Sequence, residues 1–546
     1  MNSILNEKPE LVSTGEGFCV LNTVKYKEKF LYSKYSPDKN ITRIINEKEI
    51  KPNTLVVVFS PCLWYGLDLL KTKCDSTCEI LALEGDKELY NLASSQLNNE
   101  INFINSNDKG KIEEFVNELL RTKNIKRAVR IDFSGGVQFN IESYNFIFTQ
   151  IQNLISQYWK NKITLIQFGK LYAKNILLNL SNLADSLQLE QLSSTISKPI
   201  LVCGAGESLE QITKEIAEKY FVLAVDASLP YFKAKNIRPD AIVAMESQFS
   251  TIKAFIGSAN SKIPLFCDLV SRPDVPQILN GSIIYFTTKY TSSLFLEELY
   301  NSKIIKGFVP PMGSVGLACI YIALKLRKDE SVPVYFTGLD FSFTAGKTHA
   351  RNTSAHLQGL INSYRLRHIE NLNYSFREDS IKCTGKNNKK IITNNIMQIY
   401  AEQFHLQFIN EKNIYDAGKT GLELGFERAD LEKITLSENK AAENNFQEII
   451  CRTIKNTQNS SGEKKYLEKE KNELLIIKDL LENGEKSKHF DETETLEAQL
   501  FNKIKTHDYL YLHFPDSNSI TLNKSFFKRI KAELIYFLKQ INSAFL

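Results

Sequence analysis

A chain of 546 residues is longer than one hydrophobic core usually serves, so two or three domains are expected. Its 43% hydrophobic and 24% charged residues are typical of a folded protein and exclude general disorder. A net charge of +5, without a short run dominated by Lys and Arg, argues against nucleic acid as a partner.

The sequence also lacks the usual signs of a membrane or secreted protein. It has no run of about 18 apolar residues, and its first twenty residues carry Glu7, Glu10 and Glu16 instead of a basic start and an apolar stretch. Nine cysteines without framework spacing argue against a disulfide scaffold, and no metal site is predicted. We therefore expect a cytoplasmic protein with no membrane span.

Residues 1–190 are predicted to form a Rossmann-like N-terminal domain. Apolar runs at 55–59, 79–83 and 128–131 alternate with helical stretches, which predicts a parallel sheet covered by helices. The second run is followed by Glu84 and Asp86, where such folds often hold a ribose hydroxyl. The turn at 60–66 has no Gly-x-Gly pattern that would let the backbone approach a phosphate, so no cofactor site is evident in this domain. We expect the domain to serve in packing or in positioning the substrate.

Residues 191–430 are predicted to form a doubly wound α/β domain, and residues 431–546 a helical domain. Strands are expected at 199–203, 221–225, 241–245, 263–267, 283–287 and 334–337, with helices at 209–220 and 314–326. Ser208 and Gln211 form a capping-box pattern at the start of the first helix. The C-terminal region is rich in Lys, Glu and Asn and has leucines at helical spacing.

The turn after the first of these strands is the strongest local signal. Gly204 and Gly206 permit close backbone approach, and free N–H groups at a helix start favour phosphate. Ser208 either caps the helix or donates to a phosphate. Asp226 either binds ribose or caps its own turn. Leu209 stands where a dinucleotide fingerprint has its third glycine, so an NAD site is disfavoured and a single nucleotide is possible.

Later strand ends supply further candidate residues. Glu246 ends the strand at 241–245, at the edge of the sheet where open α/β folds bind ligands. Gly313 and Ser314 precede the apolar helix and either form a wall of the same crevice or only cap the helix. Asp340 follows the strand at 334–337, and His349 lies on a polar loop where a general base could reach a ligand.

In their order along the chain these motifs resemble the central domain of the Maf family, the motility-associated flagellin glycosyltransferases. The motifs are Cys203 to Leu209, Asp226 to Ser228, Ile237 to Asp240, Gly313 to Gly316, Gly338 to Phe341 and Gly346 to Ala350. The likeness is closest over residues 195–425. That domain is in turn similar to bacterial sialyltransferases that use CMP-sialic acid.

The resemblance implies transfer of a nonulosonic acid, of the pseudaminic or legionaminic type, from a CMP donor to Ser or Thr of flagellin. No covalently bound cofactor is implied, and His349 or Asp340 would act as the general base, with His356 as a competitor for His349. The implied binding residues are Gly204, Gly206 and Ser208 at the phosphate, Asp226, Ser228 and Glu246 near ribose or base, and Gly313, Ser314, Gly338 and Asp340 around them. Two departures from the family pattern are Glu207, where a Pro is frequent, and Glu246, where an Asp is frequent.

Two other functions stay open. A similar core occurs in an archaeal-type 6-hydroxymethylpterin diphosphokinase, in which Asp226, Glu246 and Asp340 would hold Mg²⁺ for pyrophosphoryl transfer from ATP. The long flanking domains argue against that enzyme. A non-catalytic flagellin-binding protein with a decayed nucleotide pocket also fits the sequence. The main hypothesis requires the turn at 203–209 and the strand ends near Glu246 and Asp340 to form one crevice.

Overall fold

The computed structural model describes residues 8–14, 21–97, 101–366, 377–434, 446–456, 462–484, 500–517, 520 and 523–545. Contacts divide the chain into two compact units: Met1–Gln167 with His513–Thr521, and Phe168–Leu512 with Leu522–Leu546. The three domains predicted from the sequence, with boundaries near residues 190 and 430, stay a prediction. None of the helices in these described ranges is long and apolar enough to cross a membrane.

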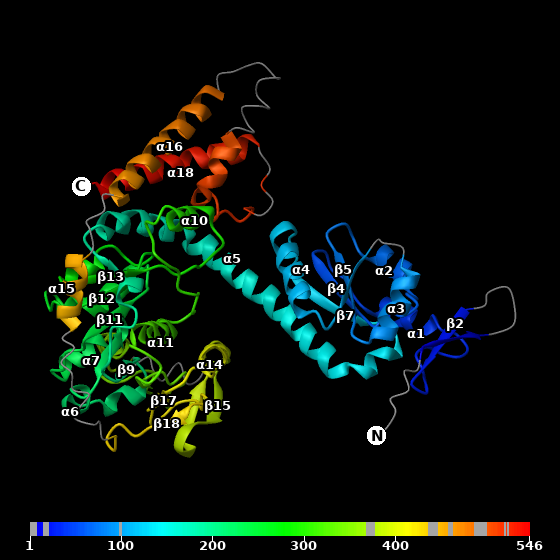
Figure 1. Cartoon of the computed structure of the whole chain (residues 1–546), viewed down its shortest axis with the longest axis horizontal. Coiled ribbons are helices and arrows are strands. Elements are labelled where there is room, and N and C mark those ends of the chain that lie inside the picture. Colours follow the sequence, from blue (N-terminus) through cyan, green and yellow to red (C-terminus); the bar gives the residue numbers. More distant parts are fainter. Residues whose placement is uncertain are drawn as a thin grey trace. The chain divides into compact units, whose positions relative to one another are not determined.

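The first unit contains a four-stranded parallel sheet with the order β6-β5-β4-β7 (Figure 1). Its strands are β4 Thr54–Phe59, β5 Glu79–Glu84, β6 Asn102–Asn105 and β7 Arg127–Asp132. Its helices are α1 Lys39–Glu47, α2 Leu67–Lys73, α3 Lys87–Gln96, α4 Lys109–Thr122 and the first part of α5 Ile141–Leu183. Alternate residues of β4 pack in two separate cores, one with α4 and α5 and one with α1 and α2. The predicted α/β pattern is confirmed.

A small antiparallel sheet of β1 Glu10–Thr14, β2 Leu21–Tyr26 and β3 Lys29–Phe30 also belongs to this unit and was not predicted. Glu84, one of the two acidic residues predicted at a ribose position, is fully buried. Its carboxylate accepts hydrogen bonds from Tyr144 (2.7 Å), Ser60 (2.8 Å) and the N–H of Gly85 (2.8 Å). Asp86, the other, caps α3. Both carboxylates are therefore held by donors of the protein itself.

The second unit is built on a nine-stranded parallel sheet with the order β18-β17-β14-β9-β10-β11-β12-β13-β8. Its strands are β8 Leu187–Gln188, β9 Ile200–Cys203, β10 Phe221–Val225, β11 Ala241–Ala244, β12 Leu265–Asp268, β13 Ile283–Phe286, β14 Val334–Thr337, β17 Ile414–Asp416 and β18 Glu427–Arg428. The six strands predicted in this region are all present, and their short apolar runs suit strands that are covered on both faces. β8, β17 and β18 were not predicted.

Helix α11, Val315–Leu326, matches the helix predicted at 314–326 and lies in the main core of this unit. Ser314 caps it by accepting the N–H of Gly316 (3.2 Å). Small residues on α11, such as Ala318 and Cys319, are fully buried against the sheet. Cys203, Cys267 and Cys319 are buried free thiols, as expected from their apolar surroundings.

The prediction of one helix over 209–220 is wrong. The segment instead forms a 3-10 helix, η3 Glu207–Gln211, and a short helix, α6 Lys214–Ala217. Thr213 caps α6 by accepting the N–H of Ile216 (3.4 Å), so it starts a new helix and interrupts the expected one. Gln211 does not complete a capping box, because its amide donates to Thr337 and to the carbonyl oxygen of Ala417 (both 2.7 Å).

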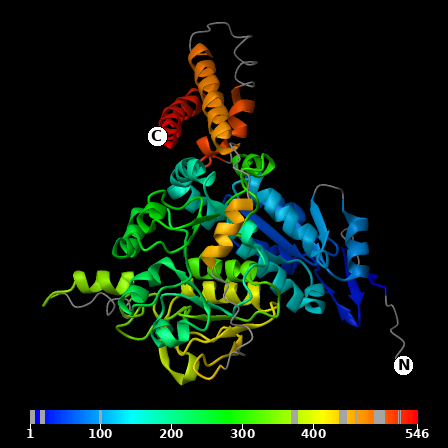
Figure 2. The same ribbon diagram turned by 60° about the vertical axis from the view of Figure 1, so that its left-hand side comes forward.

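The second unit contains further helices and a hairpin. They are α7 Leu229–Ala234, α8 Ile252–Phe255, α9 Val275–Leu279, α10 Leu294–Asn301, α12 Ser354–Ile361, the hairpin of β15 Ile381–Thr384 and β16 Lys390–Thr393, and α14 Asn395–Phe408. The C-terminal part is helical, as predicted, with α15 Phe446–Asn456, α16 Gly462–Gly484 and α18 Lys524–Ala544. α16 and α18 pack side by side, as Figures 1 and 2 show.

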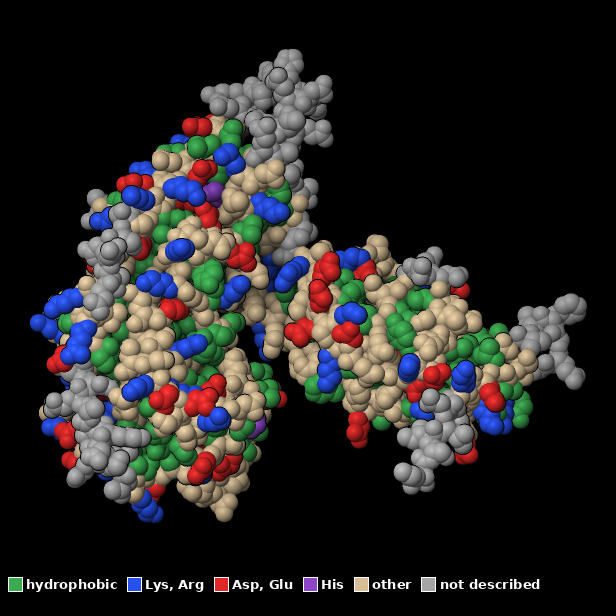
Figure 3. Space-filling view, viewed as in Figure 1, with side chains coloured by type: hydrophobic (Ala, Val, Ile, Leu, Met, Phe, Trp, Pro, Cys, Tyr) green, Lys and Arg blue, Asp and Glu red, His purple; other side chains and the backbone are tan. Residues whose placement is uncertain are grey.

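The C-terminal helices are joined to α10 through Asp508, whose carboxylate accepts the hydroxyl of Ser293 (2.7 Å) and the N–H of Leu294 (2.6 Å). This contact satisfies donors at the start of α10. On the face of the molecule in Figure 3, Lys and Arg side chains are interspersed with Asp and Glu.

Candidate active site

The candidate active site lies where the strand order of the nine-stranded sheet reverses. From β9 the chain adds β10 to β13 on one side, and then crosses back to place β14 on the other side of β9. In Figure 1, β11 to β13 lie on one side of β9, and β17 and β18 on the other. Open α/β sheets bind ligands beyond the carboxyl ends of the strands at such a point. A cavity of about 610 Å³ is lined by residues that follow β9, β10, β11 and β14. The predicted convergence of these strand ends is confirmed.

Two glycine turns, one after β9 and one after β14, line this cavity and pack tightly against each other. The N–H of Gly206 donates to the carbonyl oxygen of Gly338 (2.8 Å), and a Cβ on Gly204 would lie 2.2 Å from that oxygen. Gly338 also has a φ of +69°, which favours glycine. These glycines are therefore needed for the contact between the turns, and the N–H of Gly206 is already bonded within the protein.

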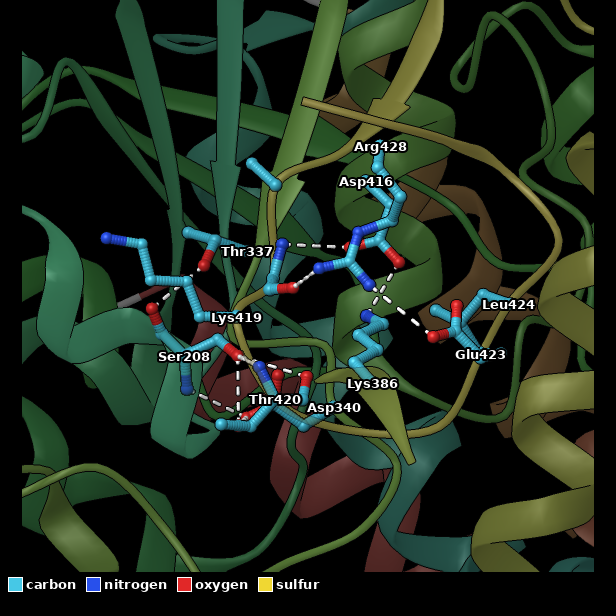
Figure 4. Close-up of polar contacts among 12 residues, drawn as sticks. Ser208, Thr337, Asp340, Lys386, Asp416, Lys419, Thr420, Glu423, Leu424 and Arg428 are labelled. Atoms are coloured by element: carbon cyan, nitrogen blue, oxygen red, sulfur yellow. Dashed lines mark hydrogen bonds and ion pairs between the residues drawn. The ribbon is translucent and has the colours of Figure 1, made fainter. Parts of the chain in front are cut away.

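Asp340 follows the second turn and is 3% exposed. Its Oδ2 accepts the N–H of Ser208 (2.8 Å) and lies 3.5 Å from the hydroxyl of Thr420 (Figure 4). Its Oδ1 is buried without a hydrogen-bond partner in the described part of the chain. Burial raises the pKa of Asp340 to about 6. A cavity residue with such a pKa can exchange a proton near neutral pH.

Ser208 is not among the residues that line the cavity, contrary to expectation. Its side chain is buried, and its hydroxyl lies 3.1 Å from the carbonyl oxygen of Thr420 and accepts the N–H of the same residue (2.9 Å). These bonds tie the turn after β9 to the loop after β17 (Figure 4). The hydroxyl is used to join two segments of the protein.

That loop after β17 is fixed in turn by a buried ion pair. Lys386, between β15 and β16, lies 2.6 Å from Asp416 at the end of β17, and both side chains are 1% exposed (Figure 4). The N–H of Lys386 also donates to the carbonyl oxygen of Gly421 (2.9 Å). The hairpin therefore holds the loop that supplies Thr420 to Asp340.

Asp226 and Glu246 line the cavity at the ends of β10 and β11, whereas Ser228 is not part of the lining. Asp226 accepts the N–H of the next residue (2.7 Å) and the hydroxyl of Thr251 (3.2 Å), so it caps its turn and also borders the cavity. Burial raises the pKa of Asp226 to about 6 and also raises the pKa of Glu246. Ser228 is fully buried and donates to the carbonyl oxygen of Val225 (2.7 Å).

The starts of three helices contribute to the same cavity. Gly313 and Ser314 precede α11, Asn394 caps α14, and Ser354 begins α12. Each helix start has N–H groups without intrahelical acceptors and about half a positive charge. None of the described residues that line this cavity is Lys or Arg. Backbone N–H groups at these helix starts are therefore the donors that the cavity offers to an anion.

His349 lies in the wall of the cavity on the loop between β14 and α12. Burial lowers its pKa, so the imidazole is neutral at neutral pH and can accept a proton. Two glutamates of η3 fix this loop. Lys347 lies 2.8 Å from Glu210 and 3.5 Å from Glu207, and the N–H of Arg351 donates to Glu210 (2.7 Å).

The proposed competitor, His356, is not among the cavity residues, and its ring nitrogen accepts the N–H of Asn352 (3.2 Å). All other predicted site residues except Ser208 and Ser228 line the cavity. No cluster of three or more His, Cys, Asp or Glu among the described residues is close enough to hold a metal ion.

Sequence reasoning missed the contribution of α14, which lines the cavity with Asn394, Ile396, Met397 and Tyr400. Asn394 caps α14 by accepting the N–H of Met397 (2.8 Å), and Thr-Asn before an apolar run is a recognisable start of a helix. The signal for a helix was therefore present. Its position beside the cavity depends on the hairpin, which no local pattern indicated.

The fold and the site together define an α/β protein with a cavity at the switch point of a parallel sheet. The structure of Maf glycosyltransferase from Magnetospirillum magneticum AMB-1 has the same fold, with a TM-score of 0.56 and 12% identity over 99% of this chain and 93% of that chain. The sequence model of the family described as 6-hydroxymethylpterin diphosphokinase MptE-like matches residues 174–346.

A protein of Treponema pallidum (strain Nichols), described as an uncharacterized protein, is 32% identical over 568 residues. The match covers 98% of this chain and 95% of that protein. The chain belongs to the family of that Treponema pallidum protein.

Proposed function

We propose that this protein is a glycosyltransferase that moves a nonulosonic acid from a CMP donor to Ser or Thr hydroxyls of flagellin. The observation that carries the proposal is a cavity at the switch point where three helix starts meet buried carboxyls and His349. The fold shared with a Maf glycosyltransferase supports the same reaction class.

The lack of Lys and Arg among the described residues of the cavity lining favours a CMP-linked sugar over a nucleoside triphosphate. The phosphodiester of a CMP-sugar carries one negative charge, which helix starts with about half a positive charge each can balance. A triphosphate carries several negative charges, and enzymes that bind it use Lys or Arg and Mg²⁺. The described lining of the cavity contains neither of these two basic residues.

In the proposed reaction, the oxygen of the acceptor hydroxyl attacks the anomeric carbon of the sugar. The bond from that carbon to the phosphate oxygen breaks, and its electron pair leaves with CMP. The proton of the hydroxyl passes to a general base, for which neutral His349 is the first candidate and Asp340 the second. The helix starts stabilise the phosphate as its charge increases. Asp226 and Glu246 accept hydrogen bonds from ribose or base.

The second candidate function is pyrophosphoryl transfer from ATP to a hydroxymethylpterin, which the family match over 174–346 favours. Asp226, Glu246 and Asp340 border the cavity but do not form a metal-holding cluster among the described residues. If the protein has this second function, a pterin together with ATP and Mg²⁺ should protect it from thermal unfolding, and CMP should not.

Intact-mass measurement of flagellin tests the proposed function directly. Flagellin from cells that carry the gene should be heavier than flagellin from a deletion strain by one or more nonulosonic acid residues. Restoring the wild-type gene should restore the added mass. Equal masses in both strains would reject the transferase and favour the non-catalytic flagellin-binding function if the two proteins still associate.

A further inference from the structure

A second cavity, of about 310 Å³, adjoins the candidate active site. It is lined by α12, by the segment that precedes β15 and by the start of α14. Thr348, His349, Asn394 and Met397 line both cavities. His349 therefore lies in the wall between two adjacent compartments.

The two compartments differ in charge. Arg377 is the one Lys or Arg among the described residues that line either cavity, and it belongs to the second. Asp379 and Ser380 line the same compartment and add groups that can bind hydroxyls or amides. A guanidinium presents a planar pair of donors that matches the two oxygens of a carboxylate.

We infer that the second cavity holds the sugar of the activated donor and that Arg377 binds the carboxylate of that sugar. The inference rests on the proposed function, and it adds where the sugar of the donor lies and which side chain binds its carboxylate. A CMP-linked nonulosonic acid has one charge on its phosphodiester and one on its carboxylate. The helix starts of the first cavity match the first charge, and Arg377 matches the second.

Size and position agree with this assignment. The volume of the second cavity is at the lower end of ligand pockets, which suits one sugar and not a whole sugar nucleotide. With the nucleotide in the larger cavity and the sugar in the smaller one, the bond that breaks lies near their shared wall. His349 in that wall is then close to the hydroxyl that attacks the anomeric carbon.

Calorimetric titration of the full chain with CMP and with CMP-N-acetylneuraminic acid tests the assignment. The wild type should bind the sugar nucleotide more tightly than CMP. Arg377→Gln should lose about tenfold or more of its affinity for the sugar nucleotide and keep its affinity for CMP. The matched control is Lys382→Gln, which removes an exposed positive charge from β15 outside both cavities and should change neither affinity.

A second variant tests the same compartment without removing a charge. Ala355 lines only the second cavity, so Ala355→Leu should weaken binding of the sugar nucleotide and leave CMP binding intact. The inference is overturned if both variants bind CMP and the sugar nucleotide as the wild type does, or if the wild type does not discriminate between them. Failure of the wild type to bind CMP at all would instead reject the proposed function.

Discussion

Asp340 has a buried carboxyl group, with one oxygen hydrogen-bonded and the other without a partner among the described residues, and its protonation depends on pH in the physiological range. Its folded-state pKa of about 6 is above the ordinary value of 3.8, because burial disfavours the charged form. The stabilisation of the folded state by its protonated form is complete below about pH 4 and is lost as the pH rises through about 6.

Asp340→Asn should therefore remove part of this pH dependence. Between pH 4 and pH 7 the free energy of unfolding of the variant should improve relative to the wild type by about 2–3 kcal/mol. Asp226 and Asp268, whose pKa values burial also raises to about 6, should contribute their own pH dependence equally in both proteins, so it cancels in the comparison. Denaturant titrations at several pH values measure the free energy of unfolding of both proteins. The same change with pH in the variant and the wild type would contradict the role of Asp340.

His349 and His356 form a natural pair for testing the general base. His349→Gln should lower kcat by about 10²- to 10⁴-fold, because the attacking hydroxyl loses its proton acceptor. His356→Gln should leave kcat within a few-fold of the wild type, since His356 is outside both cavities. The measurement is the rate of sugar transfer at saturating donor. Equal effects of the two substitutions on kcat would leave Asp340 as the better candidate for the general base.

At the level of elements, the loop that carries His349 is held by charges on η3. Glu207, which departs from the common Pro of the Maf pattern, contacts Thr344 (2.8 Å), Lys347 (3.5 Å) and Lys389 (2.9 Å). Glu210 binds Lys347 and the backbone of the same loop. The departure from the pattern therefore has a structural explanation, because a Pro would remove this carboxylate.

Exchanging the two charges tests whether this contact positions His349. Glu210→Lys and Lys347→Glu should each lower kcat by about tenfold, because each places like charges together and displaces the loop. The KM for the CMP donor should change little. The double variant should recover part of the lost kcat, since the pair is restored with opposite polarity. Additive losses in the double variant would show that the ion pair does not act as a unit.

The sequence predicted the elements that are marked by residues within or next to the element itself. Strands β9 to β14 are short apolar runs bounded by turns, and Ser314 marks the start of α11 at the right residue. Ser208 was misjudged because its partner, Thr420, is far away in sequence and on a loop that no pattern singled out. The prediction of one helix at 209–220 failed because Thr213 starts a new helix and because Gln211 bonds to distant residues.

At the scale of the second unit, the ladder between β9 and β14 joins the two halves of the sheet, and the contact between the turns after these strands extends it. Gly204→Ala should destabilise the second unit by about 3 kcal/mol, because the new Cβ would meet the backbone oxygen of Gly338 at 2.2 Å. Gly110→Ala, in α4 of the first unit, meets nothing closer than 3.8 Å and should be neutral or slightly stabilising. Chemical denaturation measures the free energy of unfolding of both variants. Equal stabilities of the two variants would show that the turns after β9 and β14 do not pack as tightly as described.

The order of strands could not be read from the sequence, although the crevice could be expected. Residues after β9, β11 and β14 were predicted to converge because parallel strands end at one edge of a sheet. That β14 returns beside β9 is a property of the whole chain. The same holds for the second cavity, which α12, the segment before β15 and α14 form together.

Ligand binding by the wild-type chain, compared for CMP and for ATP with Mg²⁺, is the most direct test that the switch-point cavity accepts a cytidine monophosphate group. CMP should raise the melting temperature in a concentration-dependent manner, and ATP with Mg²⁺ should not. Ala227→Phe, which fills the same cavity, should abolish the CMP effect. Stabilisation by ATP with Mg²⁺ and none by CMP would contradict the account.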